Sequence, residues 1–203
     1  MYIAEKYNFL KIKFMAKKSK LPVKLIKYLE STGIKHEILE HRTVYTALDV
    51  AATMKRKLGE IAKSLLIKAD QDYYLVLLPA DHNLDFDKLK KVIGKARGKE
   101  VKTLKIPGEK IVEGALKAKV MTITAFGNLH KLAVVMDKKL EQTKKAIFSA
   151  GSSNHSVEMV VKDFIKLESP ILGSFGVKRK IKKSNKKNMA KKKAKKAKKA
   201  CKK

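Results

Sequence analysis

Three short segments of the sequence join polar or glycine residues to a run of β-forming residues, and strand ends of this kind often carry binding and catalytic groups. They comprise residues 61–67, 122–127 and 148–155. In the first, the period-two geometry of a strand places Lys63 on the same face as Leu65 and Ile67, so its ammonium can lie against an apolar wall. In the third, Gly151 permits a close approach of the backbone. The alternative interpretation is a solvated lysine and an ordinary hairpin loop.

The sequence lacks the motifs of the common nucleotide-dependent and metal-dependent enzymes. It contains no P-loop, no GxGxxG and no HExxH, and its five histidines lack the spacing of a zinc site. The single cysteine, Cys201, excludes an internal disulfide and a cysteine-based zinc cluster. No G-x-S-x-G elbow supports a Ser-His-Asp triad, so that arrangement is set aside. We therefore expect neither a metal nor a cofactor.

Hydrophobic periodicity and capping signals predict the helices that position these segments. Leu25 and Leu29 lie four residues apart behind Pro22, and Gly33 follows as a stop, which indicates a helix over residues 22–32. Further helices are predicted from Thr46 with a capping box to Asp49, near residue 58, over residues 86–94 with a stop at Gly94, after Pro107, and over residues 163–167.

Runs rich in β-branched and aromatic residues predict the strands. The clearest signal is a hairpin in which residues 70–72 separate two such runs. The predicted strands comprise residues 36–40, 64–69, 73–80, 120–124, 132–136, 146–149 and 157–161. Because strands and helices are interspersed and hairpins are present, the sequence favours a mixed α/β fold in which a single mixed β-sheet is covered by helices.

The charge of the chain is concentrated at its C-terminus. The 203 residues include 49 Lys and Arg against 19 Asp and Glu, and 16 of the basic residues lie between positions 178 and 203, where no acidic residue occurs. The net charge of +30 argues for a polyanionic partner such as nucleic acid. Since like charges repel one another, we expect residues 173–203 to form a disordered tail that contacts phosphates. The alternatives are a solubilising tail and a localisation signal.

The remaining organisation follows from composition. Residues 1–20 form a basic N-terminal extension, and residues 21–172 form one domain that is large enough to build its own core. The apolar runs are far shorter than the ~20 residues that a membrane helix needs, and the N-terminus lacks a secretory pattern. We therefore expect a cytoplasmic protein without a membrane segment. A polybasic protein held on an anionic membrane is the alternative, but the chain lacks the amphipathic face that such binding needs.

Together these segments resemble the YbaK/prolyl-tRNA synthetase editing-domain family, the free-standing aminoacyl-tRNA deacylases. The likeness covers residues 21–172 and rests on the order and spacing of several short motifs. The motifs comprise residues 45–52, 63–65, 77–81 with 84–85 and 89, 125–127, and 149–152 with 154–155. The resemblance implies a single mixed α/β domain that hydrolyses the ester of a wrongly charged tRNA without a metal.

The resemblance also implies roles for single residues. Lys63 matches the family's key lysine, which lies beside the aminoacyl-adenosine end of the tRNA and can bind a phosphate or polarise the ester. The loop that ends at Gly127 matches a loop whose backbone amides bind the scissile carbonyl oxygen. The chain departs from the family here, because Met121 and Thr122 stand where glycines are usual. Ala125 likewise replaces the usual proline.

The third segment matches a Gly-x-x-x-His pattern of the members that remove alanine, in which the histidine limits the size of the pocket. The expected catalytic residues are Lys63, Gly127, Ser149 and Gly151. The expected substrate-binding residues are Tyr45, Ile123, Thr124, Ala125, Phe126, Asn154 and His155. The expected contacts with the tRNA backbone are Lys191, Lys192, Lys193, Lys195, Lys196, Lys198 and Lys199.

By this resemblance the protein is expected to be a trans-editing deacylase of tRNA charged with a small wrong amino acid, such as alanine on tRNA(Pro). The partners are mischarged tRNA and, as a candidate, an aminoacyl-tRNA synthetase. Family members use the substrate's own ribose hydroxyl and water in place of a protein base, which agrees with the lack of a carboxylate pair in the sequence. The alternative is a non-catalytic RNA-binding or synthetase-associated module of the same fold.

Overall fold

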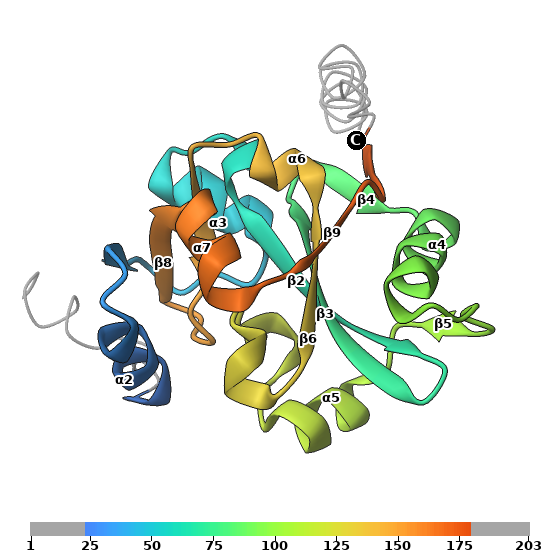
Figure 1. Ribbon diagram of the computed structural model, residues 1–203. Helices are drawn as coiled ribbons and strands as arrows, with labels where there is room; N and C mark the ends of the chain where they lie inside the picture. The colour runs from blue at the N-terminus through green and yellow to red at the C-terminus, as the bar shows by residue number, and fades with distance from the viewer. Residues whose placement is uncertain (1–22, 180–203) are drawn as a thin grey trace, which may run out of the picture.

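The structure, a computed structural model, describes residues 23–179 (Figure 1). The N-terminal extension and the tail lysines 191–199 named above lie outside this range. The α-helices are α2 (Val23–Thr32), α3 (Ala47–Met54), α4 (Phe86–Arg97), α5 (Glu109–Leu116), α6 (Lys138–Glu141) and α7 (Val161–Glu168). Short 3-10 helices are η1 (Leu58–Glu60), η2 (Val120–Thr122) and η3 (Gly127–His130).

The strands form a central mixed sheet and two smaller sheets. They are β1 (His36–Glu40), β2 (Ala62–Ala69), β3 (Asp72–Pro79), β4 (His82–Leu84), β5 (Leu104–Lys105), β6 (Ala133–Asp137), β7 (Lys145–Ser149), β8 (His155–Val160), β9 (Ile171–Gly173) and β10 (Gly176–Lys178). The central sheet has the order β5-β2-β3-β6-β9, with antiparallel β2/β3 and parallel β3/β6 and β6/β9 pairs. This confirms the predicted mixed α/β fold with a mixed sheet.

The smaller sheets divide the remaining strands. β1, β8 and β7 form an antiparallel sheet, and β10 pairs with β4. A parallel bridge between Ile61 and Ile147 joins the β1-β8-β7 sheet to the start of β2. The strand ends of both sheets therefore meet at one place, which is where the candidate site lies.

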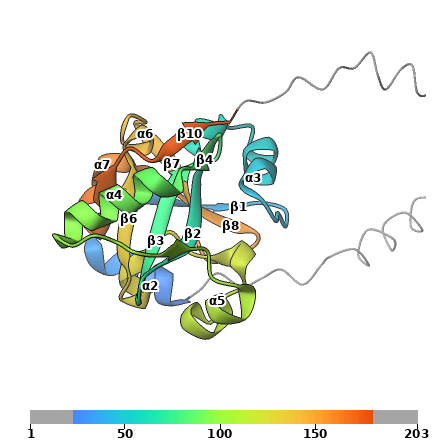
Figure 2. The ribbon, with the colours of Figure 1, turned by 90° about the vertical axis from the view of Figure 1, so that its right-hand side faces the viewer.

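Two apolar clusters fill the two faces of the central sheet because strand residues alternate between them. On one face, Leu66 and Leu77 pack with the aromatic residues of β7 and α7. On the other face, Ile67 and Val76 pack under Leu89 of α4. Figure 2 shows α4 in front of the central strands, with β1 and β8 behind them. The predicted placement of Leu65 and Ile67 on one face is confirmed.

Local signals fix several boundaries as predicted. The capping box at the start of α3 is present, since the Asp49 amide donates to the Thr46 Oγ1 at 3.1 Å and the Thr46 amide donates to the Asp49 Oδ2 at 3.0 Å. β2 and β3 form the predicted hairpin, and Asp70 takes a positive φ in the turn between them.

Two predicted elements are wrong. α4 does not end at Gly94 but continues to Arg97 and ends at Gly98, which has a φ of +64°. Gly94 instead lets the returning chain pass close by, because a Cβ there would lie 3.2 Å from the Lys99 carbonyl oxygen. Residues 120–124 form no strand; η2 begins them, with the Thr122 amide donating to the Lys119 carbonyl at 2.8 Å.

The folded body also extends beyond the predicted domain boundary at residue 172. Phe175 is fully buried in the cluster under α4, and its amide donates to the Asp137 carboxylate at 2.8 Å. β10 then pairs with β4, with Lys178 opposite His82. Residues 175–178 therefore belong to the folded body and not to the tail that was expected from residue 173.

Candidate active site

A cavity of about 290 Å³ lies where the two larger sheets meet, and it brings together four of the predicted site residues. These are Tyr45, Lys63, Ile123 and Ser149. The rest of the wall is mainly apolar, with hydroxyl groups placed in it; it comprises His41, Val44, Thr46, Ala47, Val50, Ile61, Ala62, Ser64, Leu65, Val120, Met121, Ile147, Phe148, Ser152 and Ser156. An apolar wall with a few convergent polar groups is typical of a small-ligand site.

Lys63 reaches this cavity from the first residues of β2 and is only partly exposed. Its Nζ donates a hydrogen bond to the carbonyl oxygen of His82 at 3.1 Å. Burial lowers the pKa of the Lys63 amine below its ordinary value, and the positive charge of Arg179 lowers it further. The amine is thus anchored on the side of β4 and β10, and its protonated form is less stable than that of a solvated lysine.

Ser64, the next residue of β2, carries a buried hydroxyl. Its Oγ has no hydrogen-bond partner within residues 23–179. An unpaired buried hydroxyl costs about 1–3 kcal/mol. A polar group of a bound ligand would offset this cost.

The loop that ends at Gly127 was expected to supply amides for the scissile carbonyl oxygen, but two of its amides already form hydrogen bonds within the protein. The Ala125 amide donates to the Ser149 carbonyl at 3.0 Å, and the Phe126 amide faces the Thr124 Oγ1 at 3.4 Å. Ala125 and Phe126 are fully buried. The Phe126 ring packs among the rings of Tyr28, Phe148 and Phe164. Neither residue lines the cavity, so the structure places both in the core.

Gly127 follows this loop and has no room for a side chain. A Cβ there would lie 2.5 Å from the Leu132 carbonyl oxygen and from a methyl group of Val134. The next amide, of Asn128, donates to the buried carboxylate of Glu168 at 3.0 Å. The Tyr28 hydroxyl donates to the same carboxylate at 2.8 Å.

The environment of Glu168 shifts two pKa values. Burial raises the pKa of Glu168 above its ordinary value, and the amides of Asn128 and Gly127 partly offset this effect. Burial likewise raises the pKa of Tyr28 to about 12. The sequence carries no local signal for this cluster, because Tyr28, Asn128 and Glu168 are distant in the chain.

The turn between β7 and β8 holds the third predicted segment. Gly151 has a φ of +79°, and its amide donates to the Ser149 Oγ at 3.3 Å. The Ser152 Oγ donates to the Asn154 Oδ1 at 2.8 Å and lies 3.1 Å from the His155 Nδ1. Ser152 lines the cavity, whereas Asn154 and His155 lie behind it. These two residues therefore contact the site through Ser152.

Thr124 and Gly151 face a second cavity of about 410 Å³. It lies on the other side of residues 120–124 and is also lined by Lys24, Lys117 and His130. Burial lowers the pKa of His130, and Lys24 adds to this effect. The structure thus divides the predicted substrate-binding residues between two neighbouring cavities and the core.

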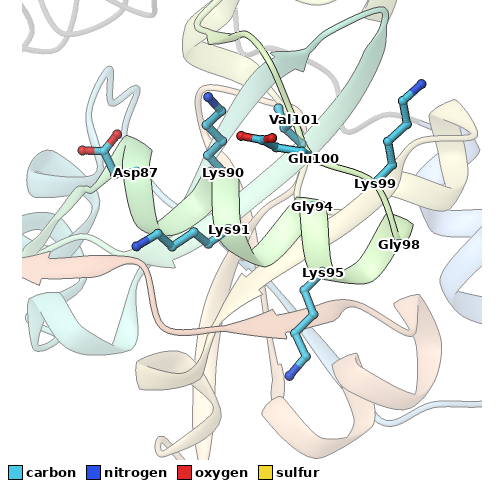
Figure 3. Close-up of a pocket in the computed structure, with 9 residues that line it drawn as sticks. All are labelled: Asp87, Lys90, Lys91, Gly94, Lys95, Gly98, Lys99, Glu100 and Val101. Carbon is cyan, nitrogen blue, oxygen red and sulfur yellow. The ribbon is translucent and has the colours of Figure 1, made fainter.

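A hollow of about 700 Å³ lies along α4, away from these residues (Figure 3). Its wall is polar and carries both charge signs; it includes Asp87, Lys90, Lys91, Lys95, Lys99 and Glu100. None of the predicted site residues lines this hollow. Within residues 23–179 no three His, Cys, Asp or Glu side chains gather as metal ligands. No helix in that range is long and apolar enough to cross a membrane.

Comparisons with known proteins identify the family of the chain. The family described as aminoacyl-tRNA editing domain matches residues 41–167. The multifunctional Ser/Thr-tRNA deacylase ProXp-y of Escherichia coli K12 is 28% identical over 166 residues, which cover 79% of this chain and 96% of that protein.

Two solved structures share the fold. A proposed trans-editing enzyme for prolyl tRNA synthetase superposes with a TM-score of 0.64 at 20% identity, covering 78% of this chain and 99% of that one. A hypothetical protein superposes with a TM-score of 0.66 at 17% identity, covering 76% and 99% of the two chains.

Proposed function

Because the chain belongs to the aminoacyl-tRNA editing domain family and is a hydrolase of aminoacyl-tRNA, we propose that it removes small wrong amino acids from tRNA in trans. The observation that carries the choice of substrate is the cavity of about 290 Å³ with Lys63 in its wall. Since a water molecule occupies about 30 Å³ in the liquid, the cavity admits a small aminoacyl group. We place the activity in the cytoplasm, with a synthetase as a candidate partner.

Alanine, serine and threonine are the side chains that this wall suits. Its apolar residues exclude larger groups, although each methylene separates substrates by only ~1–3 kcal/mol. The unpaired Ser64 hydroxyl offers a hydrogen bond to a polar group of the substrate. The E. coli relative is named for serine and threonine, which supports including the hydroxylated substrates with alanine.

Within this proposal Lys63 binds a phosphate or polarises the ester, and Tyr45, Ile123 and Ser149 line the aminoacyl site. Gly127 and Gly151 shape the two loops. The remaining predicted residues support the wall from behind: Thr124, Ala125, Phe126, Asn154 and His155. His155 would limit the size of the pocket through its contact with Ser152.

A deacylation assay on a panel of tRNAs charged with alanine, serine, threonine or proline tests the proposal. Lys63→Ala should slow hydrolysis of the preferred substrate by ~10²–10³-fold, the usual range for loss of a preorganised charge. Lys68→Ala is the matched control, because Lys68 lies at the other end of β2, over the Tyr73 ring.

A Lys63→Ala variant as fast as the parent would refute the role of Lys63. A parent that binds tRNA in a salt-dependent manner but hydrolyses no member of the panel would favour the non-catalytic RNA-binding module.

A further inference from the structure

The second cavity beside the candidate active site, of about 410 Å³, has positive charge in its wall. Lys24 of α2, Lys117 directly after α5 and His130 of η3 line it, and no Asp or Glu of residues 23–179 is among its lining residues. A concave surface with cationic groups and no carboxylate attracts anions. Burial and the charge of Lys24 lower the pKa of His130, which agrees with a positive field in this cavity.

The inner part of this cavity is mainly apolar. Leu25 of α2 and Leu116 of α5 line it and are almost completely buried, and Leu129 of η3 lines it and is partly buried. Lys24 and Lys117 are exposed, so the charges lie toward the mouth of the cavity. The cavity therefore suits a ligand that has an anionic group and a less polar body. A nucleotide is such a ligand, since nucleotide sites combine cations for the phosphate with apolar contacts to the base.

A short segment of backbone separates this cavity from the candidate active site. Val120, Met121 and Ile123 line the active-site cavity, whereas Thr122 and Thr124 line the second cavity. The segment runs inward from the surface, because Met121 is 57% exposed and Thr124 is only 6% exposed. The two cavities therefore meet at the exposed end of this segment.

The turn between β7 and β8 continues the partition between the cavities. Ser149 and Ser152 line the active-site cavity, whereas Ala150 and Gly151 line the second cavity. The Ala125 amide donates to the Ser149 carbonyl at 3.0 Å, which joins this turn to the end of the preceding segment. A ligand that occupies both cavities must therefore be a chain that bends over the partition. The single-stranded 3′ end of a tRNA is such a chain.

We propose that the second cavity binds the cytidine that precedes the terminal adenosine of tRNA, together with its phosphate, while the aminoacyl-adenosine occupies the active site. This inference rests on the proposed deacylase function. Lys24 and Lys117 bind the phosphate as point charges, and the leucine side chains contact the base and ribose. Phosphate contacts position a nucleic acid without reading its sequence. The subsite therefore orients the 3′ end and does not select one tRNA.

Two substrates that carry the same amino acid separate the two cavities. One is mischarged tRNA, and the other is the aminoacyl ester of adenosine, which has no cytidine and no phosphate. Lys24→Ala and Lys117→Asn should each raise KM for the tRNA by ~2–5-fold, the range for an exposed ion pair, with little change in kcat. Neither variant should change kcat/KM for the adenosine ester.

The variants are chosen to keep the fold. Lys117 has a φ of +51°, and asparagine adopts this left-handed backbone more readily than most residues. Lys27→Ala is the matched control, because Lys27 is an exposed lysine of the same helix as Lys24 but does not line the cavity. It should keep the KM of the parent for both substrates. An equal rise of KM in Lys27→Ala would mean that any lysine of α2 attracts tRNA and would overturn the subsite.

The ring of His130 measures occupation of the cavity directly. The charged groups that line the cavity with it are Lys24 and Lys117, so an anion bound between them offsets their charge and favours protonated His130. In nuclear magnetic resonance titrations of the parent, the trinucleotide CCA should raise the pKa of His130. Inorganic phosphate at the same concentration should not, because it lacks the base and ribose. An equal rise with phosphate alone would indicate a site for the free anion and would overturn the assignment to RNA.

The outcomes distinguish the subsite from the proposed function. If the parent deacylates the panel, the subsite is refuted by an unchanged KM for tRNA in both variants, or by a pKa of His130 that CCA leaves unchanged. The deacylase function then stands. Equal losses on tRNA and on the adenosine ester would place the effect of the variants in the aminoacyl site and would also refute the subsite. A parent inert toward the whole panel would refute the function, even if CCA raised the pKa of His130.

Discussion

The amine of Lys63 combines two properties that oppose each other. It lies partly buried beside the candidate site, where a charge acts strongly on a bound ester. The same burial, with the nearby charge of Arg179, lowers its pKa and so favours the neutral amine, which binds phosphate less well. The hydrogen bond to the His82 carbonyl stabilises the amine in place. Activity that depends on its charge is therefore sensitive to alkaline pH.

We expect Arg179→Ala to extend activity to higher pH. Removing the repulsion raises the pKa of Lys63 toward its ordinary value, so the amine stays protonated as the pH rises. The alkaline limb of kcat/KM should move upward, although only partly, since burial is the larger cause of the shift. Complete pH profiles on one mischarged tRNA measure this. Lys178→Ala, an exposed neighbour, is the control, and an unmoved limb in Arg179→Ala would contradict the assignment.

For single residues, the sequence predicted the strand face on which Lys63 lies but not the groups that contact its amine. The alternation of β2 suffices to place Lys63 with Leu65 and Ile67. Its partner, the His82 carbonyl, belongs to another strand and depends on how β4 returns beside β2. The sequence likewise did not predict that His41 and Ser156 lie together in the cavity wall, because only the pairing of β1 with β8 brings them close.

Among the elements, η3 depends on a carboxylate supplied by another helix. Glu168, the last residue of α7, accepts hydrogen bonds from the Asn128 amide and the Tyr28 hydroxyl. These bonds link α2, α7 and the loop that passes Ala125. The loop beside the cavity is thus held from the side away from the substrate.

Glu168→Ala should lower the free energy of unfolding and change its pH dependence. Leaving the Asn128 and Tyr28 donors unpaired costs about 1–3 kcal/mol. Because folding raises the pKa of Glu168, the stability from this group is fully present below the ordinary glutamate pKa and is lost as the pH rises through the raised value. Urea unfolding over a pH series should show that this decline disappears in the variant.

Glu113→Gln on the exposed face of α5 controls for the loss of a charge. A Glu168→Ala variant with the parent's pH dependence would contradict the assignment of this decline to Glu168.

Elements with local signals were predicted well, and those fixed by tertiary contact were not. The capping box of α3 and the β2/β3 hairpin depend on neighbours in the sequence. Gly94 is a residue type that often ends a helix, but here its lack of a side chain allows the backbone at Lys99 to pass close to α4. Residues 120–124 are rich in β-formers, yet they begin with η2 and form a hydrogen bond with β7 only at its last residue, where the Thr124 hydroxyl donates to the Ser149 carbonyl.

For the whole molecule, the charge of the sequence did not show where the described folded body ends. Phe175 looked like part of a polar tail, and only the apolar cluster under α4 shows why it is buried. The division of the strands among three sheets likewise depends on distant pairings. Composition therefore does not locate the tertiary contacts that keep residues 173–178 in the folded body.

We expect deletion of residues 180–203 to flatten the salt dependence of tRNA affinity and to raise KM more than it lowers kcat. This deletion spares Phe175 and β10 and removes 14 basic residues. For each RNA phosphate that is no longer neutralised, the slope of log K against log salt should fall by roughly 0.7–0.9. Filter binding across a salt series measures the slope.

A chain of the same length, with serine in place of each lysine from 180 to 203, separates charge from length. Equal slopes for the parent and the deletion would contradict a role of the tail in RNA binding.

The pairing of β10 with β4 fixes where everything after Arg179 starts. Lys178 lies opposite His82, whose carbonyl oxygen contacts the Lys63 amine, and the Arg179 amide donates to the Asp81 carbonyl at 2.8 Å. The lysine-rich C-terminal segment therefore leaves the folded body close to the proposed active site and not on the opposite side of the protein. On the proposed role of the tail, an acceptor stem bound by its first lysines would be within reach of the cavity, and the more distant charges would serve to capture tRNA from solution.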